Sequence, residues 1–371
     1  MMIFNARVLT MENEHFDFGF VRFENGKIVS LGDMADAPAP GPDDFDAARG
    51  YVIPGFIDAH CHTGLYIYDI TETTEPVTPQ MRVIDSVESG NPDFADAVKA
   101  GITAGAISPG SSNLIGGEIA LLKFAGRTVE EMFVRTCGMK GALGANPIET
   151  HRREAKRIPY TRMGSAALLR DAFTRAQRYA KAKAEDRARE TDAGLEALLP
   201  VIRGELPMHF HAHRSDDIMT AVRIAGEFNI RCAVVHATGG HVVADKLAQA
   251  EVPVILGPVL FPNCKPEMDE GEAANINALD RAGADFCFGT DAQVIRGADL
   301  PVSAAVAISS GLDEMRALRA LTRDAARILG ASDRLGSLQT GKDADIAVFD
   351  DFPLSYTAHV KAVFVDGVRR C

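Results

Sequence analysis

The chain has 371 residues, of which 46% are hydrophobic and 24% are charged, and this excludes disorder, collagen and coiled coil as descriptions of the whole chain. Its 39 basic and 51 acidic residues give a formal net charge of −12, which argues against nucleic acid and anionic membranes as partners. The six cysteines are scattered, and no apolar run approaches the ~20 residues of a membrane span. We therefore expect a cytoplasmic protein with a small-molecule substrate. The sequence is compatible with a homo-oligomer.

Both ends of the chain predict short β-strands. Strand-like runs cover 3–11, 18–24 and 27–31 near the start, and 345–349 and 360–365 near the end. Asn25-Gly26 and Asp366-Gly367 are hairpin signals. Neither end has enough strands for a stable sheet alone, so residues 1–54 and 335–371 are predicted to form one small β-sandwich domain together.

Residues 55–334 alternate apolar runs with amphipathic stretches. The runs lie at 101–108, 207–213, 232–237, 252–257 and 285–291, and the helical stretches at 94–100, 165–184, 216–228, 240–248 and 313–328. This alternation predicts an α/β fold with parallel strands and helical crossovers, and its length fits a (β/α)8 TIM-like barrel. An open doubly wound sheet is the alternative, but the GxGxxG loop that it would favour is absent.

Histidines and one aspartate close several of the apolar runs. His60 and His62 end the first run, His211 lies in the HFHAH run, His236 ends the next, and Asp291 ends DFCFGTD. In a parallel barrel these strand ends meet at one rim. Residues two apart on a strand face the same side, so both imidazoles of the HxH pair can approach one cation. The pattern predicts a divalent metal site.

The segments PGFIDAHCH (54–62), GTD (289–291) and GSLQTGKDADIAVFD (336–350) resemble the amidohydrolase superfamily. The segments GSSNLIGGE, HAHRSDDIMTAVRIAGEFN and VPVILGP are similar to its imidazolonepropionase-related branch of uncharacterised amidohydrolases. The resemblance implies five metal ligands: His60, His62, His211, His236 and Asp291. It also implies that Asp291 and His236 are catalytic, with Asp291 as general base and then acid toward a metal-activated water. Zinc suits this donor set best, with iron and manganese as alternatives.

Four further residues are candidates for bridging two metals or contacting substrate: Lys140, Glu118, His213 and His241. His209 is expected inside the barrel. Relatives in the superfamily commonly carry GENP and TDHP, where this chain has Ala145 in GANP and Ala292-Gln293 after Asp291. Both departures favour one ion over two.

The expected reaction is hydrolysis of a C–N bond in an amide, a cyclic amide or imide, or an N-acyl or dipeptide-like substrate. One alternative is a deaminase of an aromatic heterocycle on the same scaffold. Another is a catalytically silent paralogue that binds a metabolite. The sequence does not name the substrate.

Overall fold

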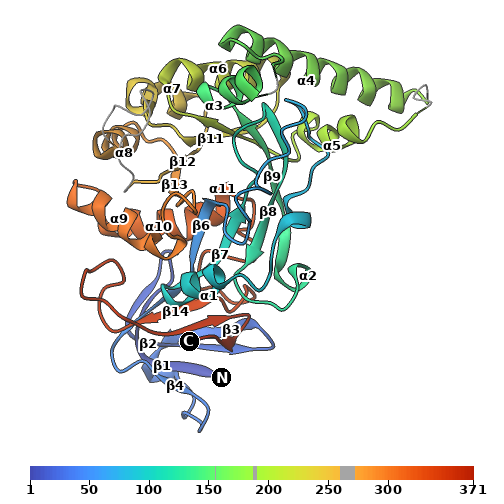
Figure 1. Cartoon of the computed structure of the whole chain (residues 1–371). Coiled ribbons are helices and arrows are strands. Elements are labelled where there is room, and N and C mark those ends of the chain that lie inside the picture. Colours follow the sequence, from blue (N-terminus) through green and yellow to red (C-terminus); the bar gives the residue numbers. More distant parts are fainter. Residues whose placement is uncertain (155, 187–189, 260–271) are drawn as a thin grey trace.

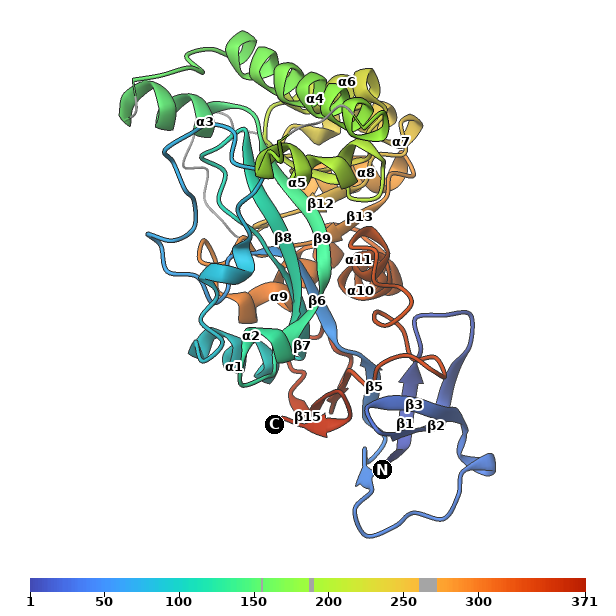
Figure 2. The ribbon, with the colours of Figure 1, turned by 90° about the vertical axis from the view of Figure 1, so that its right-hand side faces the viewer.

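The computed structural model describes residues 1–154, 156–186, 190–259 and 272–371 (Figure 1). It contains two large sheets, one built from both ends of the chain and one built from the middle. Figure 2 shows the barrel at the top and the first sheet below it, with both termini near that sheet. Cys264 lies outside the described residues, and the other five cysteines are free.

The terminal sheet has the strand order β16-β15-β14-β5-β1-β2-β3, with β4 paired to β1. Because β14 pairs with β5, the C-terminal strands extend the sheet that the N-terminal strands begin. The described strands therefore make one continuous mixed sheet, with the hairpins predicted at 25–26 and 366–367. Its strands are β1 (Met2–Leu9), β2 (His15–Glu24), β3 (Lys27–Asp33), β4 (Phe45–Asp46), β5 (Tyr51–Pro54), β14 (Ile346–Phe349), β15 (Val360–Val365) and β16 (Val368–Arg369).

The second sheet runs in sequence order from β6 to β13 and forms the predicted barrel. Its ends meet at the rim, where the Asp291 amide donates to the His60 carbonyl at 2.9 Å and the His62 amide donates to the Ala292 carbonyl at 2.5 Å. Its strands are β6 (Phe56–Cys61), β7 (Ile102–Ile107), β8 (Ile115–Lys123), β9 (Phe133–Ala142), β10 (Met208–Ala212), β11 (Cys232–His236), β12 (Val254–Leu256) and β13 (Phe286–Phe288).

One barrel strand differs from the parallel arrangement expected from the sequence. β8 is antiparallel to both of its neighbours, β7 and β9. A parallel neighbour needs a crossover of a dozen or more residues, usually a helix, and only residues 108–114 join β7 to β8. The expectation of parallel strands is therefore wrong for β8, whereas β9 to β13 run parallel as expected.

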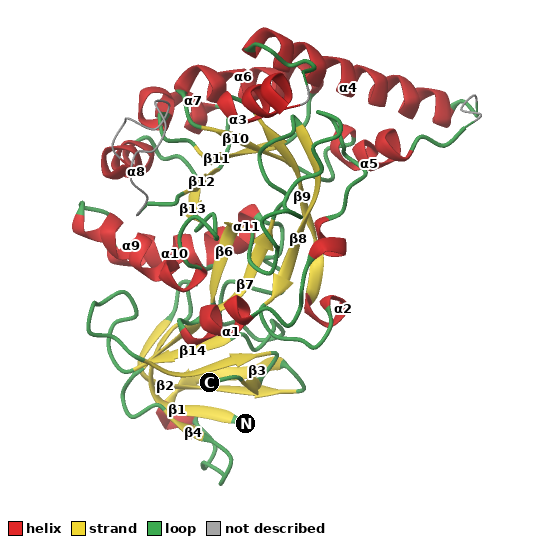
Figure 3. Ribbon diagram, viewed as in Figure 1, coloured by secondary structure: helices red, strands yellow, loops and turns green. Residues whose placement is uncertain are grey.

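Helices surround the upper part of the barrel, and the stretch predicted as one helix at 313–328 is two helices that meet at Thr322 (Figure 3). In the described ranges, no helix is both long enough and apolar enough to cross a membrane. The helices are α1 (Pro92–Lys99), α2 (Val129–Met132), α3 (Ala145–Glu149), α4 (Arg162–Ala184), α5 (Ala193–Ile202), α6 (Ser215–Phe228), α7 (Ala244–Gln249), α8 (Glu272–Arg281), α9 (Leu300–Ser309), α10 (Glu314–Leu321) and α11 (Arg323–Ile328).

The two sheets are joined at Gly55 and by a buried ion-pair cluster. Gly55 separates β5 from β6, and a Cβ there would lie 2.1 Å from Thr103 Oγ1, so the passage between sheets requires glycine. Lys123, at the end of β8, is buried and pairs with Asp343 at 2.7 Å, with Asp345 at 3.1 Å and with Asp366. Breaking a buried pair leaves an uncompensated charge, so this cluster fixes the barrel on the terminal sheet.

Candidate metal centre and active site

The end of β6 and the turn after β13 bring three donor groups together. His60 and His62 face the same side because they lie two residues apart, as predicted. Asp291 Oδ1 lies 3.2 Å from Nε2 of each histidine. Donors bound at ~2.0–2.1 Å around a tetrahedral ion lie about 3.3 Å from one another, so the spacing of these three atoms suits one metal ion.

A second group of donors lies on the neighbouring strands. The ligand atoms of three histidines lie within 4.8 Å of one another. These are His211 on β10, His213 just after that strand, and His236 at the end of β11. The His213 ring stacks on His236, with 4.9 Å between ring centroids and 13° between planes. The His60 and His236 centroids are 5.5 Å apart, so His236 lies between the two groups. The structure thus brings His213 nearer to the other candidate ligands than the sequence indicated.

Backbone carbonyls fix the protonation of two of these imidazoles. Nδ1 of His62 donates to the Ser108 carbonyl at 2.7 Å, and Nδ1 of His236 donates to the Gly257 carbonyl at 2.6 Å. In a neutral imidazole the other nitrogen, Nε2, then carries a lone pair, which is the form that binds metals. The Nε2 lone pair of His62 therefore faces Asp291 Oδ1. A proton or a metal ion between these two atoms would relieve the repulsion between their electron pairs.

Burial makes a metal ion a better cation here than extra protons. The pKa values of His60 and His211 lie well below their ordinary value, chiefly because burial disfavours imidazolium. Burial alone would raise the pKa of Asp291, but the facing imidazoles, His236 foremost, outweigh it and hold that pKa well below its ordinary value. Neutral imidazoles and an ionised carboxylate form the donor set that zinc, iron and manganese accept. These residues fit the metal that the fold implies.

The turns that carry two of these donors, His236 and Asp291, hold strained backbone. His236 and Asp291 have φ angles of +72° and +52°, in the left-handed region that residues other than glycine rarely adopt. Such conformations persist where the surroundings impose them, and they cluster at functional sites. Gly289 lets β13 approach β6 closely, since a Cβ at this position would lie 2.8 Å from the His60 amide nitrogen.

Asp58 supports this turn and was missed by sequence reasoning. It is fully buried on β6, and its carboxylate accepts from the Thr290 amide at 3.0 Å and from the Thr290 hydroxyl at 2.5 Å. Burial raises its pKa to about 7, against these hydrogen bonds. The available signal was its position two residues before His60, on the same face of the strand. Asp58 thereby fixes the turn that presents Asp291.

Lys140 lies beside the first group of donors. It projects from β9, is 1% exposed, and its Nζ lies 3.5 Å from His60 Nε2. Burial lowers its pKa to about 8, although Asp291 acts in the opposite direction. His209 is fully buried on β10 beside Lys140, as expected for the barrel interior, and neither ring nitrogen has a hydrogen-bond partner among the described residues.

Glu118 and His241 are not brought to the donors. Glu118 stands opposite Met139 in the β8–β9 ladder, one residue out of step with the Gly117–Lys140 pair, so it faces the other side of the sheet. Its carboxylate accepts from the Thr136 hydroxyl at 3.3 Å. His241 lies in the short helix at Gly240–Val243 and is not among the described residues that line the cavity.

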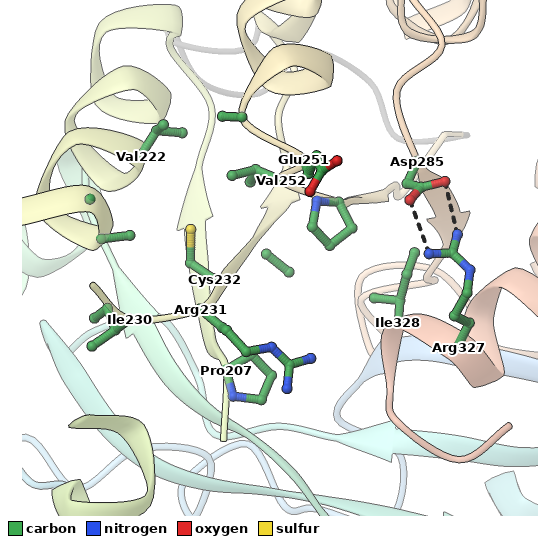
Figure 4. Close-up of a pocket in the computed structure, with 15 residues that line it drawn as sticks. Pro207, Val222, Ile230, Arg231, Cys232, Glu251, Val252, Asp285, Arg327 and Ile328 are labelled. Atoms are coloured by element: carbon green, nitrogen blue, oxygen red, sulfur yellow. Dashed lines mark hydrogen bonds and ion pairs between the residues drawn. The ribbon is translucent and has the colours of Figure 1, made fainter. Parts of the chain in front are cut away.

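A cavity of about 460 Å³ opens directly onto the donors. Its floor is made by His62, His211, His213, His236 and Asp291, and its walls by loops that follow β6, β7, β9, β12 and β13. Active sites of such barrels lie at this end, where the strands end. Figure 4 shows a different cavity, of about 580 Å³, whose lining includes Pro207, Cys232 and an Asp285–Arg327 ion pair. That cavity lies where β10, β11 and β13 begin and contains none of the donors.

Comparison with known proteins supports the same interpretation. The chain is 29% identical to amidohydrolase tasK of Hapsidospora irregularis over 95% of its length, although it spans only 40% of that protein. It is 24% identical to the imidazolonepropionase of Rhizorhabdus wittichii over 93% of this chain and 92% of the relative. The crystal structure of an amidohydrolase from Thermotoga maritima superimposes with a TM-score of 0.94 at 36% identity, covering 99% of this chain and 98% of that one.

Residues 51–370 match the amidohydrolase family. This match spans the barrel, both donor groups and the last strands of the terminal sheet. The chain therefore belongs to the amidohydrolase family and is a metal-dependent amidohydrolase.

Proposed function

We propose that this enzyme hydrolyses the C–N bond of an amide or cyclic amide, with Asp291 as the proton carrier. The observation that carries the proposal is the contact of Asp291 Oδ1 with Nε2 of both His60 and His62 at 3.2 Å. These three residues would hold one divalent ion, with zinc favoured over iron or manganese. His211 and His236 complete the proposed ligand set.

The bound ion would supply Lewis acidity and lower the pKa of a water ligand toward 7. Asp291 stays ionised at neutral pH because its pKa is held low, so it can accept a proton from the attacking water. It can then return that proton to the leaving nitrogen, which departs as a neutral amine. His236 belongs to the second donor group, lies next to His60 of the first and is the second catalytic candidate.

We favour one ion per chain. Asp291 is the only carboxylate in either of the donor groups found among the described residues, and the buried group beside them, Lys140, is an amine. In the superfamily that the sequence resembles, a carboxylated lysine often bridges two ions. Elemental analysis measures the number of metal ions per chain, and one ion would support the proposal. Two ions in the native protein and one in Lys140→Ala would instead identify Lys140 as the bridge.

A product assay tests the reaction class. The metal-loaded enzyme is incubated with linear amides, cyclic amides, N-acyl amino acids and aminated heterocycles, and the products are identified by mass spectrometry. The proposal predicts acids and amines, or ring-opened acids. Ammonia released only from heterocycles would show the deaminase instead. Absence of turnover across the panel with metal bound would favour the silent paralogue.

A further inference from the structure

From the walls of the candidate active-site cavity we infer the class of substrate: a neutral amide that carries an apolar group. The inference rests on the proposed function and adds a specificity surface to it. We define this surface, the apolar wall, as Ile67, Ile70 and Val294, all of which line the cavity.

Two residues of the apolar wall are exposed although they border a polar centre, whereas Ile70 is partly buried against the core. Ile67 is 63% exposed and Val294 is 40% exposed. The two residues come from different loops, one after β6 and one after β13, yet both face the cavity that holds the donors. Exposed apolar side chains grouped at a cleft mark a surface that a ligand covers. Burying them against an apolar substituent releases water from both.

The remaining walls are polar but uncharged. Thr71, Ser111, Ser112 and Asn146 line the cavity, and the Asn146 amide donates to Ser111 Oγ at 2.6 Å. Asn146 Nδ2 also lies 3.3 Å from His211 Nε2, so its amide group stands at the edge of the donors. Hydroxyl and amide groups can pair with a neutral amide without the cost of burying a charge.

No lysine or arginine lines this cavity in the part of the chain that the structure describes. Arginines in the loops at this end of the barrel are already paired with neighbouring acids, as in Arg157–Glu75, Arg214–Asp216 and Arg296–Asp299, each at 2.7 Å. A substrate carboxylate at the apolar wall would lose hydration and would meet no lysine or arginine among the described lining residues. The wall therefore selects against acidic substrates as well as for apolar ones.

Two isosteric probes test this. 4-Methylpentanohydroxamate and succinic monohydroxamate share the metal-binding group and chain length, and differ in ending with an isopropyl group or a carboxylate. Their dissociation constants are measured by calorimetry on the metal-loaded enzyme, and turnover is measured with the matching p-nitroanilides. The apolar probe is expected to bind about 10-fold to 200-fold more tightly, the range for one apolar group in a pocket.

Arginine variants test whether the apolar wall causes the difference in binding between the two probes. Ile67→Arg and Val294→Arg each place a cation on the apolar wall and are expected to shift the ratio of the two dissociation constants at least about 10-fold toward the acidic probe. Tyr68→Arg is the matched control, because it adds the same charge at a 92% exposed neighbour that does not line this cavity. The control should leave the ratio unchanged.

The outcomes separate the inference from the proposed function. Equal binding of the two probes, or tighter binding of the acidic one, overturns the inference while amide turnover still supports the hydrolase. An equal shift in all three arginine variants also overturns it, because the effect would then be long-range. Failure of the metal-loaded enzyme to bind either probe or to cleave any amide overturns both.

Discussion

At the scale of single residues, the candidate metal centre depends on hydrogen bonds that orient its imidazoles. The carbonyl groups of Ser108 and Gly257 hold the Nδ1 protons of His62 and His236. The turn at Asp291 depends in the same way on Asp58. These supporting groups are not ligands, but their replacement in metal sites typically costs 10–100-fold in affinity or activity.

Replacing Asp291 with Asn is expected to lower kcat by at least about 100-fold, because an amide cannot accept the proton from the attacking water. The fold should survive, since Asn keeps the size of the side chain. Steady-state kinetics and circular dichroism measure both effects. Asp299→Asn is the control, because Asp299 follows the same strand but pairs with Arg296 outside the donor groups. Near-normal turnover by the Asp291 variant with metal bound would contradict the assignment.

Replacing His62 with Ala should weaken the metal itself. The variant loses one of the two imidazoles whose Nε2 lies 3.2 Å from Asp291 Oδ1, so we expect the dissociation constant for the metal to rise more than about 100-fold, beyond the effect of a supporting residue. Competition with a chromophoric chelator measures this constant. His241→Ala, which removes a histidine beyond the donor groups, should leave it unchanged. Equal metal affinity in the two variants would exclude His62 as a ligand.

Residue parity and strand ends predict much of the donor set from the sequence. His60, His62 and Asp291 converge as expected because β6 and β13 end side by side. The carbonyl partners could not be predicted, since Ser108 and Gly257 lie far from their histidines in the sequence and contribute only backbone atoms. The nearness of His213 to His211 and His236 depends on the course of the chain beyond the end of β10, which the sequence pattern does not specify.

At the scale of elements, the sequence predicted the barrel, but it predicted neither the strand β8 nor its antiparallel direction. The alternation of apolar runs and amphipathic helices predicts strands joined by helices, but it does not predict a connection that has no helix. Residues 108–114 form such a connection, and β8 turns back along β7. The hairpins at 25–26 and 366–367 follow from local turn chemistry, whereas the pairing of β14 with β5 requires contacts between the two ends of the chain.

The cluster that links β8 to the terminal sheet predicts an unusual pH dependence. Burial raises the pKa of Asp345 to about 6, although Lys123 opposes this. In the unfolded chain the value is ~3.9. Between these values the folded chain holds a proton that the unfolded chain has released, so this carboxyl makes the fold less stable as pH rises from 4 to 7.

Asp345→Asn removes that ionisation but keeps an oxygen for Lys123 and for the Asp366 amide. The free energy of unfolding of the native protein minus that of the variant should therefore fall by about 2 to 3 kcal/mol between pH 4 and pH 7. Urea denaturation across this range measures the difference. A constant difference would contradict the raised pKa of Asp345, because the folded and unfolded chains would then bind its proton equally.

At the scale of the whole molecule, the two ends of the chain are predicted to be one folding unit. Truncation after Leu335 removes β14 and β15 and leaves β5, a buried strand, as a bare edge. We expect this variant to aggregate, as followed by light scattering and size-exclusion chromatography. Removal of residues 370–371 alone, which belong to no strand, should be tolerated. A soluble and fully active truncation after Leu335 would contradict the predicted domain boundaries, 1–54 with 335–371.

The most direct test of the central claim is the rate of amide cleavage as a function of bound metal. The purified enzyme is assayed as isolated, after removal of metal by a chelator, and after addition of one equivalent of zinc, iron or manganese. We predict that the chelator abolishes C–N cleavage and that one equivalent of a single divalent ion restores it, with Asp291→Asn inactive under the same conditions. Cleavage that persists in metal-free enzyme, or that the Asp291 variant retains with metal bound, would contradict a metal-dependent hydrolase built on these residues.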